Sequence, residues 1–330
     1  MTEHPEMKYF SVSELENSLG SVRLEDFIKS CEKSFLHKLF EISTEIAWNS
    51  EIKAVFISGP TSSGKTTTTD RLAGGLHFCG KEAVRLSLDD YYIPHHNAGS
   101  VNGRKDLESI TTLDVEAIHR DLEMLLEGKR VKVPRFDFPT RTRVYDQEDI
   151  QLKEKDILLV EGLHGLSEEI AGSLDSSQWY GIMLRPWATL ISDRRLLSPR
   201  DIRMLRRSAR DVYHRNTPAL ATIDYWPMLD ATEEAFFPEY IQRADVFINT
   251  AFAYEFCVIP QLAKSALQAD LLAYENGNLK TSPYVADGLD YADIELAVEE
   301  AKRLVKACDE LPAVSPDRIP PISILNEFIH

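Results

Sequence analysis

The 330-residue sequence has few cysteines, no long apolar run and no excess of basic charge, and each absence excludes a class of protein. Its four cysteines, Cys31, Cys79, Cys257 and Cys308, lie far apart and form no CxxC pair, so we expect reduced thiols rather than disulfides or zinc ligands. No apolar run approaches the roughly 18 residues that a membrane span needs. The first ten residues also lack the basic-then-apolar pattern of a signal peptide, so a cytoplasmic location is the default expectation.

Acidic residues outnumber basic ones by 53 to 37, and the formal net charge is −16. This balance argues against general binding to nucleic acid or to anionic membranes. Any polyanionic ligand must therefore be held by a local cluster of basic side chains. Hydrophobic residues make up 43% of the chain, which is typical of a folded globular protein, and the length allows one large or two modest domains.

A glycine-rich turn at 57–66, ISGPTSSGKT, is the most informative segment. It fits the pattern GxxxxGK[ST] and lies between an apolar run, 53–58, and a predicted helix, 65–77. We therefore predict a phosphate loop whose amides surround the β-phosphate, with Lys65 on the β- and γ-phosphates and Thr66 on Mg²⁺. The predicted contacts with the nucleotide come from Gly59, Pro60, Thr61, Ser62, Ser63, Gly64, Lys65, Thr66 and Thr67.

Buried strands alternate with helices along the rest of the chain. The predicted strands are 53–58, 82–88, 156–162, 179–184 and 245–250, and the predicted helices are 24–48, 65–77, 114–127, 201–215, 258–274 and 291–309. This alternation predicts an α/β fold with a doubly wound, mostly parallel sheet, whose ligands bind at the carboxyl ends of the strands.

The ends and the loops of the chain are less regular. Residues 1–22 are predicted to be a loose lead-in, and the amphipathic helix 24–48 packs on the main domain, 51–330, or on something else. We expect a long loop over 93–112 and a short hairpin or extended excursion over 130–143. The proline-containing segment IPPISILNEF, 319–328, is predicted to be a rigid strap without chemistry.

Two carboxylates follow predicted strands and therefore fall at the ligand-binding edge of the sheet. Asp89 is placed to accept a proton from an attacking hydroxyl and to approach the metal; the alternative is a loop or helix-cap carboxylate. Glu161 follows four apolar residues, where a carboxylate is costly unless it faces a metal or its water. Together with Lys65 and Thr66, these side chains offer most of what phosphoryl transfer requires.

A basic helix is predicted near the middle of the chain, within 198–217. Four arginines recur at helical spacing and form one stripe: Arg203, Arg206, Arg207 and Arg210. The apolar stripe on the other side consists of Ile202, Leu205, Ala209 and Val212. Since arginine forks suit phosphate oxygens, we predict that one face packs and the other is a lid that closes over ATP. Asp201 and Asp211 are expected only to balance the arginines.

Taken in order, these segments resemble one known family. The segments are GPTSSGKT (59–66), LDDYY (88–92), FDFPTRTR (136–143), LLVEGLHGL (158–166), DIRMLRRSARDVYHR (201–215), ADVFIN (244–249) and IPPISILNEF (319–328). From about 55 to 330 the chain is similar to the phosphoribulokinase and uridine kinase family of P-loop kinases, and nearest to its bacterial uridine kinase-like branch. The resemblance implies ATP and Mg²⁺ as cofactors and a nucleoside, uridine or cytidine, phosphorylated on its primary hydroxyl.

The resemblance also implies roles for single residues. It makes Asp89 the catalytic aspartate, associates Thr66 and Glu161 with magnesium, and makes Arg203 and Arg206 the arginines that hold the ribose and phosphates. From the residues themselves, we expect Lys65 and Arg206 to assist catalysis and Asp89 to approach the metal as well. Arg207 and Arg210 would hold the nucleotide. The residues that would contact the acceptor substrate are Tyr92, Phe136, Phe138, Arg141 and Arg203.

Two positions depart from the family pattern. Arg141 stands where uridine kinases have a histidine that reads the pyrimidine. The acid that grips the ribose usually lies in a histidine-proline-aspartate stretch, and here 106–114 offers only Glu108 or Asp114 as substitutes. These departures keep open a second kinase interpretation, with a polyol, sugar or sugar phosphate as acceptor.

A nucleotide-dependent switch without acceptor chemistry is the third interpretation. The sequence has no NKxD guanine signature, and a pure switch has no need of an acceptor base such as Asp89. Whether the protein forms a homo-oligomer stays open.

Several other residues are not assigned to the predicted site. His95 and His96 are predicted loop residues, and His164 either lines the site or is a packed histidine. Tyr225 and Trp226 are predicted to be core. The acidic residues Glu233, Glu234 and Glu239 are predicted to be solvated surface.

Overall fold

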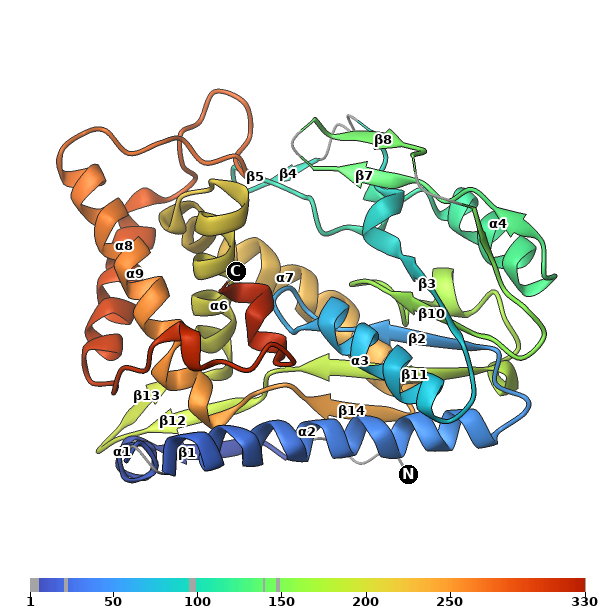
Figure 1. The fold of residues 1–330 in the computed structure, drawn as a ribbon. Helices are drawn as coiled ribbons and strands as arrows, with labels where there is room; N and C mark the ends of the chain where they lie inside the picture. The colour runs from blue at the N-terminus through green and yellow to red at the C-terminus, as the bar shows by residue number, and fades with distance from the viewer. Residues whose placement is uncertain (1–5, 21–22, 95–98, 139, 147–148, 330) are drawn as a thin grey trace.

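The computed structural model describes residues 6–20, 23–94, 99–138, 140–146 and 149–329, and a five-stranded parallel sheet lies at its centre (Figure 1). Its strands, in spatial order, are β14 (Val246–Asn249), β11 (Trp179–Arg185), β2 (Ala54–Ser58), β10 (Ile157–Glu161) and β3 (Ala83–Ser87). Every neighbouring pair is parallel. The five predicted strands agree with these bounds to within one residue, so the doubly wound parallel sheet is confirmed.

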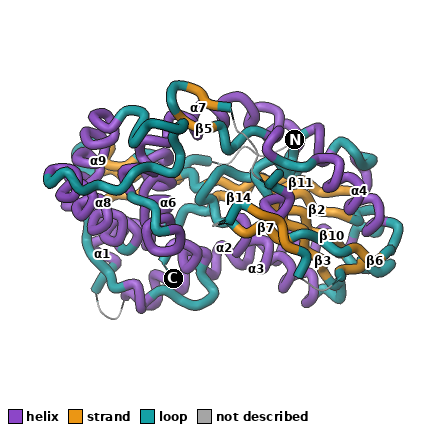
Figure 2. Tube along the Cα trace, turned by 90° about the horizontal axis from the view of Figure 1, so that it is seen from above, coloured by secondary structure: helices purple, strands orange, loops and turns teal. Residues whose placement is uncertain are grey.

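Helices cover both faces of this sheet (Figure 2). The helices of the described residues are α1 (Val12–Ser18), α2 (Arg23–Trp48), α3 (Lys65–Phe78), α4 (Val115–Leu126), α5 (Glu168–Ala171), α6 (Pro199–Arg215), α7 (Ala219–Arg243), α8 (Ile259–Glu275) and α9 (Ile294–Asp309), of which α2 and α3 lie on one face and α4, α5 and the end of α7 on the other. The buried strand β2 shows why two layers are needed: Val55 and Ile57 pack in the core with α2 and α3, while Ala54 and Phe56 pack with α4, α5 and the end of α7. Helices α6 to α9 form a further layer beside the sheet.

The remaining strands form small sheets around the edge. They are β1 (Lys8–Ser11), β12 (Ala188–Ile191) and β13 (Arg195–Leu197) in one sheet, and the pairs β4 (Ser100–Val101) with β5 (Arg104–Lys105), β6 (Arg130–Val131) with β9 (Ile150–Gln151), and β7 (Arg135–Asp137) with β8 (Thr142–Val144). The last pair confirms the hairpin predicted within 130–143.

The segment 6–20 is ordered, and the prediction of a loose lead-in is wrong for it. Strand β1 pairs in parallel with β12, and Lys8 Nζ donates to the carbonyl of Ala251 over 3.0 Å. Ser11 and Glu14 form a capping box at the start of α1. Pairing with a strand 180 residues away holds this segment in place, and its own sequence does not announce that partner.

Of the two alternatives for the amphipathic helix, the structure has α2 packed on the main body. It contacts α3 and buries Phe35, Leu39, Ile42 and Ile46 in the same core as β2. Its exposed end carries Trp48, which is 84% exposed.

Helix α7 has no counterpart among the predicted helices. It runs without interruption through Pro227 and Pro238, although proline removes a backbone donor from a helix interior. Packing compensates, because Tyr225 and Trp226 are fully buried, as predicted for core residues.

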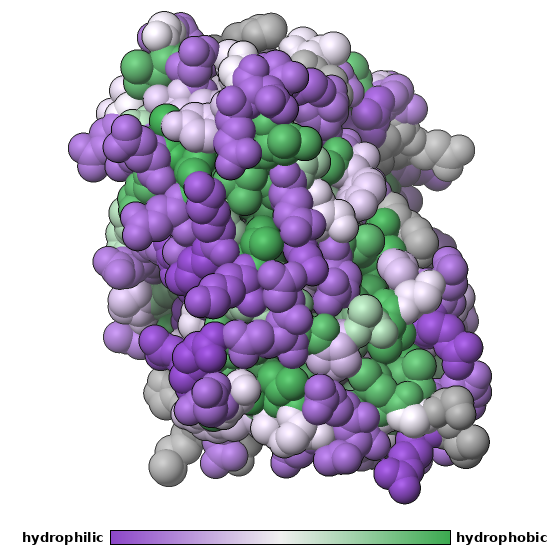
Figure 3. All heavy atoms as spheres, turned by 90° about the vertical axis from the view of Figure 1, so that its left-hand side faces the viewer, coloured by the Kyte–Doolittle hydropathy of each residue, from purple (hydrophilic) through white to green (hydrophobic). Residues whose placement is uncertain are grey.

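The side of the molecule on which α8 and α9 lie is mainly hydrophilic, with hydrophobic side chains between the charged ones (Figure 3). Leu272 of α8 and Leu296 of α9 are among the exposed hydrophobic residues. Within the described residues, no helix combines the length and the apolar character that crossing a bilayer demands.

Candidate active site

The phosphate loop connects β2 to α3 at the carboxyl edge of the sheet. Gly64, at φ 85°, adopts a left-handed conformation that favours glycine, and a Cβ on Gly59 would come within 2.5 Å of the Leu184 carbonyl oxygen. Lys65 Nζ folds over the loop and donates to the carbonyls of Gly59 and Pro60 over 3.0 and 3.2 Å. The loop therefore has the shape that the sequence predicts.

Two hydroxyls of the loop are buried without a partner in the described structure. The Oγ atoms of Ser62 and Ser63 have no hydrogen bond within the described residues. Buried hydroxyls normally find a partner, so this loop fits a ligand rich in acceptor oxygens, such as a polyphosphate.

Glu161 ends β10 and faces the start of α3. Its Oε1 accepts hydrogen bonds from Thr66 Oγ1 over 3.3 Å and from Ser87 Oγ, at the end of β3, over 3.0 Å. Burial, and then the charge of Asp89, raise the pKa of Glu161 to about 7, while Lys65 opposes the shift. Thr66 and Glu161 are thus adjacent, as predicted, and Ser87 is a third oxygen that the sequence analysis does not name.

Asp89 lies directly beyond β3, in the short helix η1 (Leu88–Tyr91), and is partly exposed. Its charge adds to burial in raising the pKa of both Glu161 and Glu108. The neighbouring Asp90 has a different contact, because its Oδ1 accepts from the backbone N–H of Phe136 over 2.9 Å. Asp90 thus holds the β7–β8 hairpin, and the role of Asp89 as a base stays a prediction.

The oxygens beside Thr66 suit Mg²⁺, which keeps several waters and takes one or two carboxylates together with substrate phosphates. Glu161 and the hydroxyl of Thr66 would hold such an ion, with Asp89 nearby. Within the ranges that the structure describes, no group of three or more His, Cys, Asp or Glu side chains gathers as a dedicated metal site.

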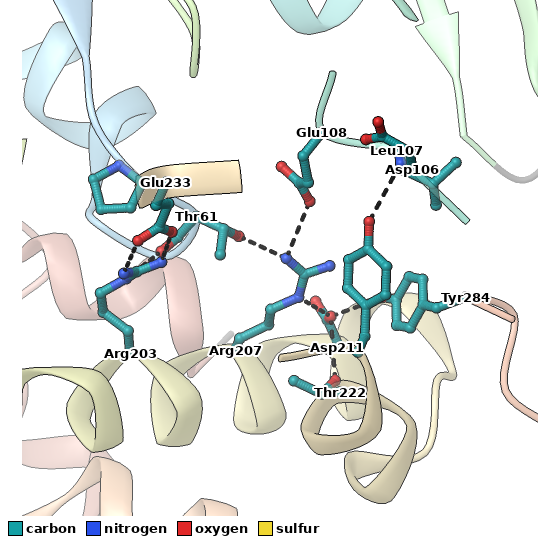
Figure 4. Close-up of polar contacts among 12 residues, drawn as sticks. Thr61, Asp106, Leu107, Glu108, Arg203, Arg207, Asp211, Thr222, Glu233 and Tyr284 are labelled. Carbon is teal, nitrogen blue, oxygen red and sulfur yellow. Dashed lines mark hydrogen bonds and ion pairs between the residues drawn. The ribbon is translucent and has the colours of Figure 1, made fainter. Parts of the chain in front are cut away.

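The arginines of α6 reach the outer side of the phosphate loop (Figure 4). Arg203 Nε donates to the carbonyl of Thr61 over 3.2 Å, and its Nη1 donates to Glu233 over 2.6 Å. Arg207 Nη1 donates to Thr61 Oγ1 over 3.1 Å and lies 3.5 Å from the carboxylate of Glu108. The loop backbone is thereby fastened to α6.

Arg206 makes a second set of contacts with the loop. Its Nη1 donates to the carbonyl of Ser62 over 3.2 Å, and its Nε donates to Glu255 Oε1 over 3.0 Å. The side chain of Arg206 is completely buried. Because every face of this guanidinium is enclosed by protein, it positions the loop in this structure.

The prediction that α6 presents an open arginine face is wrong for this structure. Arg203, Arg206 and Arg207 are all buried, because α7 supplies Glu233 and the segment after β14 supplies Glu255. Glu233 is itself buried, so its predicted place on the solvated surface is also wrong. Whether α6 moves as a lid stays a prediction.

On the side of α6 away from Glu233, the Asp211 carboxylate is the negative charge that balances the arginines. Arg207, Arg210 and Arg215 all lie within 3.6 Å of its carboxylate, and Tyr284 donates to it over 3.0 Å. Burial works against ionisation, yet these arginines hold the pKa of Asp211 below its ordinary value. The expectation that Asp211 balances the arginine stripe is therefore supported. The Arg210 guanidinium is one of the groups that pair with the Asp211 carboxylate.

Three aromatic side chains form a cluster across from the loop. The ring centroids of Tyr92, Phe136 and Phe138 lie 5.2 to 5.9 Å apart. Phe138 is 48% exposed, and the Arg215 guanidinium lies 5.7 Å from its ring centroid. Arg141 follows in the turn of the hairpin at φ 52°, an uncommon conformation for a residue with a Cβ. The structure thus brings together the predicted aromatic residues and adds Arg215.

The two candidate acids of 106–114 have different surroundings. Glu108 is largely buried beside Arg207, and burial raises its pKa. Asp114 caps α4 through the amide of Ala117 and pairs with Arg143 over 2.8 Å. Only Glu108 faces the phosphate loop, which leaves it as the better placed of the two.

His164 belongs to the core rather than to the reacting groups. One ring nitrogen lies 2.6 Å from the Tyr240 hydroxyl and the other lies 2.7 Å from the Glu108 carbonyl. Burial lowers the pKa of His164 to about 4. His95 and His96 lie outside the described residues.

Comparison with known proteins finds a family likeness for one stretch of the chain. Residues 54–184 match the sequence profile of the Phosphoribulokinase / Uridine kinase family. This segment holds the phosphate loop, Asp89 and Glu161, whereas α6 lies beyond it. The part of the site that the segment contains is therefore similar to that of a kinase family.

Individual relatives of the family are distant. The chain is 32% identical over 146 residues, or 44% of its length, to "Inorganic pyrophosphatase TTM2" of Arabidopsis thaliana, but it spans only 20% of that protein. It is 24% identical over 201 residues to a uridine kinase of Halobacterium salinarum, covering 59% of this chain and 79% of that one. A structure described as a possible uridine kinase from Bacillus stearothermophilus aligns over 60% of this chain and 88% of that chain, with 20% identity and a TM-score of 0.40.

Proposed function

We propose that the protein is an ATP-dependent kinase that phosphorylates the primary hydroxyl of a nucleoside, uridine or cytidine. The observation that supports this most is the meeting of Lys65, the Thr66–Glu161 pair and Asp89 at one edge of the sheet. A kinase needs a phosphate grip, oxygens for Mg²⁺ and a base for the acceptor hydroxyl, and these side chains have the matching chemistry.

Each of these groups has one task in the proposed reaction. The loop amides and Lys65 would hold the β- and γ-phosphates, and Thr66 and Glu161 would hold Mg²⁺, which would neutralise charge on the phosphates. Asp89 accepts the proton of the acceptor hydroxyl as that oxygen attacks the γ-phosphorus. Lys65 and the arginines Arg206, Arg207 and Arg210 would stabilise the transferring charge, the arginines after a movement of α6.

The acceptor would lie between Asp89 and the aromatic cluster. A nucleobase suits the exposed face of Phe138, which packs against Tyr92, since stacking on aromatic rings tolerates flat heterocycles. Glu108 lies on the loop side, where its carboxylate could accept hydrogen bonds from ribose hydroxyls. The similarity to a uridine kinase of Halobacterium salinarum, at 24% identity, supports this choice.

The test is a screen for acceptor-stimulated release of ADP in the presence of ATP and Mg²⁺. Uridine and cytidine should stimulate release strongly, and Lys65→Ala should abolish the stimulation. Slow ATP hydrolysis that no nucleoside, sugar or polyol accelerates would point to a nucleotide switch and would refute the kinase proposal.

A second acceptor class is favoured by one observation. Arg215 lies over Phe138, and Arg141 lies in the adjoining turn, so the aromatic cluster has cationic neighbours where uridine kinases have a histidine. Arginine forks bind phosphate and carboxylate groups, which an uncharged nucleoside does not offer. A sugar phosphate that outcompetes uridine in kcat/KM, with the advantage lost in Arg141→Gln, would establish this alternative.

A further inference from the structure

The segment 319–329 lies against the phosphate loop and α6 (Figure 1). It contains the short helix η6 (Ile324–Phe328). Ile324 is fully buried, and its Cδ1 lies only 2.9 Å from where a Cβ on Gly64 would stand. The predicted strap therefore packs directly on the loop that should receive phosphates.

Glu327 brings a negative charge to this contact. Its Oε2 accepts a hydrogen bond from Thr67 Oγ1 over 3.3 Å. Thr67 belongs to the first turn of α3, where the helix dipole and unpaired amides attract anions. The Glu327 carboxylate therefore lies beside the region that the phosphates of a nucleotide would occupy, and it also raises the pKa of Glu161.

The other end of the segment is fastened separately. Arg71 of α3 donates to the carbonyls of Ile322 and Pro321 over 3.0 and 3.3 Å. Ser323 Oγ lies 2.7 Å from the buried hydroxyl of Tyr254. Residues 321–323 are thus anchored beside the site, whereas η6 reaches the phosphate loop through Ile324 and Glu327.

We propose that η6 is a cover of the phosphate loop that a bound nucleotide displaces, with the Glu327 carboxylate as the competing anion. The proposal rests on the proposed function, because it assumes that a nucleotide binds this loop. A polyphosphate and a carboxylate at one helix terminus repel each other, so the nucleotide binds at the expense of the Glu327–Thr67 contact. Ile324, Leu325 and Phe328 of η6 are fully buried, so displacing η6 also costs the burial of these side chains, while residues 321–323 keep their own contacts.

The experiment compares Glu327→Gln with the unmodified chain by calorimetric titration with MgADP. The substitution keeps the size of the side chain and removes its charge, so we expect roughly threefold to tenfold tighter binding. Asp317→Asn is the matched control, since it removes one charge from an exposed position of the neighbouring 3₁₀ turn and should leave the affinity unchanged. Hydrogen exchange of peptides from 319–329 should become faster when MgADP is added to the unmodified chain.

Two results would overturn the cover. One is a Glu327→Gln affinity equal to or weaker than that of the unmodified chain while MgADP still binds. The other is slower exchange of 319–329 with MgADP, which would make η6 a wall of the nucleotide site. If the unmodified chain binds no MgADP at all, the proposed function fails, and the cover fails with it.

Discussion

The hydroxyl of Thr66 donates to the carboxylate of Glu161 over 3.3 Å, although 95 residues separate them in the chain. This hydrogen bond joins the start of α3 to the end of β10. Since β10 is buried and α3 packs against it, the two oxygens are held in place before any ligand arrives. The following predictions test what this arrangement does.

Asp89→Asn should retain nucleotide affinity and lose about 10²- to 10⁴-fold in turnover, because an amide cannot accept the acceptor's proton. Binding of MgADP and steady-state ADP release measure the two effects. Asp90→Asn is the matched control: its amide oxygen can still accept from Phe136 N–H, so most turnover should remain. Equal losses in the two variants would remove Asp89 as the base.

Glu161→Gln should raise the Mg²⁺ concentration needed for half-maximal activity by about tenfold or more, since an amide oxygen is a weaker ligand than a carboxylate. Titration of activity with Mg²⁺ at fixed ATP gives this value. Ser87→Ala removes only one hydrogen bond to the same carboxylate and should cause a smaller shift. An unchanged requirement in Glu161→Gln would place the metal elsewhere.

The stability of the metal-free protein should depend on pH, because the pKa of Glu161 is raised in the folded state. The folded pKa of about 7 lies above the ordinary value of 4.5, so the stabilising contribution is complete below pH 4.5 and is lost as pH rises through about 7. The glutamine in Glu161→Gln does not titrate, so this variant does not lose stability in this way. Its melting temperature in EDTA should therefore exceed that of the unmodified chain increasingly from pH 5 to pH 8, and a constant difference would contradict the assignment.

Glu233→Gln should lower the free energy of unfolding by about 3 kcal/mol, because it leaves the buried Arg203 guanidinium without its counter-charge. Urea denaturation measures the change. Glu234→Gln, at the exposed neighbouring position, should stay within about 0.5 kcal/mol. Equal effects from the two substitutions would mean that Arg203 does not depend on this pair.

The edge of the sheet could be predicted because its sequence signals are local. An apolar run that ends in a glycine-rich turn fixes the phosphate loop, and a carboxylate directly after such a run marks Glu161. The meeting of these ends then follows from the parallel arrangement alone. The hairpin and its aromatic residues Phe136 and Phe138 could be predicted for the same reason, because their sequence signals lie within one short segment.

Long-range partners could not be predicted. The arginine stripe was visible, but Glu233 and Glu255, which bury it, lie 30 and 49 residues from the arginines that they pair with. Helix α7 was missed because its two prolines favour breaks, and tertiary packing overrides that preference. For 6–20, the pattern of Ser11 and Glu14 was an available signal for a helix start that the sequence analysis did not use.

The buried hydroxyl of Tyr254 contacts both Ser323 and the carboxylate of Glu32 in α2. One small polar node therefore joins three segments from distant parts of the chain. During synthesis, Glu32 leaves the ribosome long before Tyr254 and Ser323 do, so the node closes only after Ser323 has been made. Until then, the carboxylate must stay in water, and this face of the protein completes its folding late.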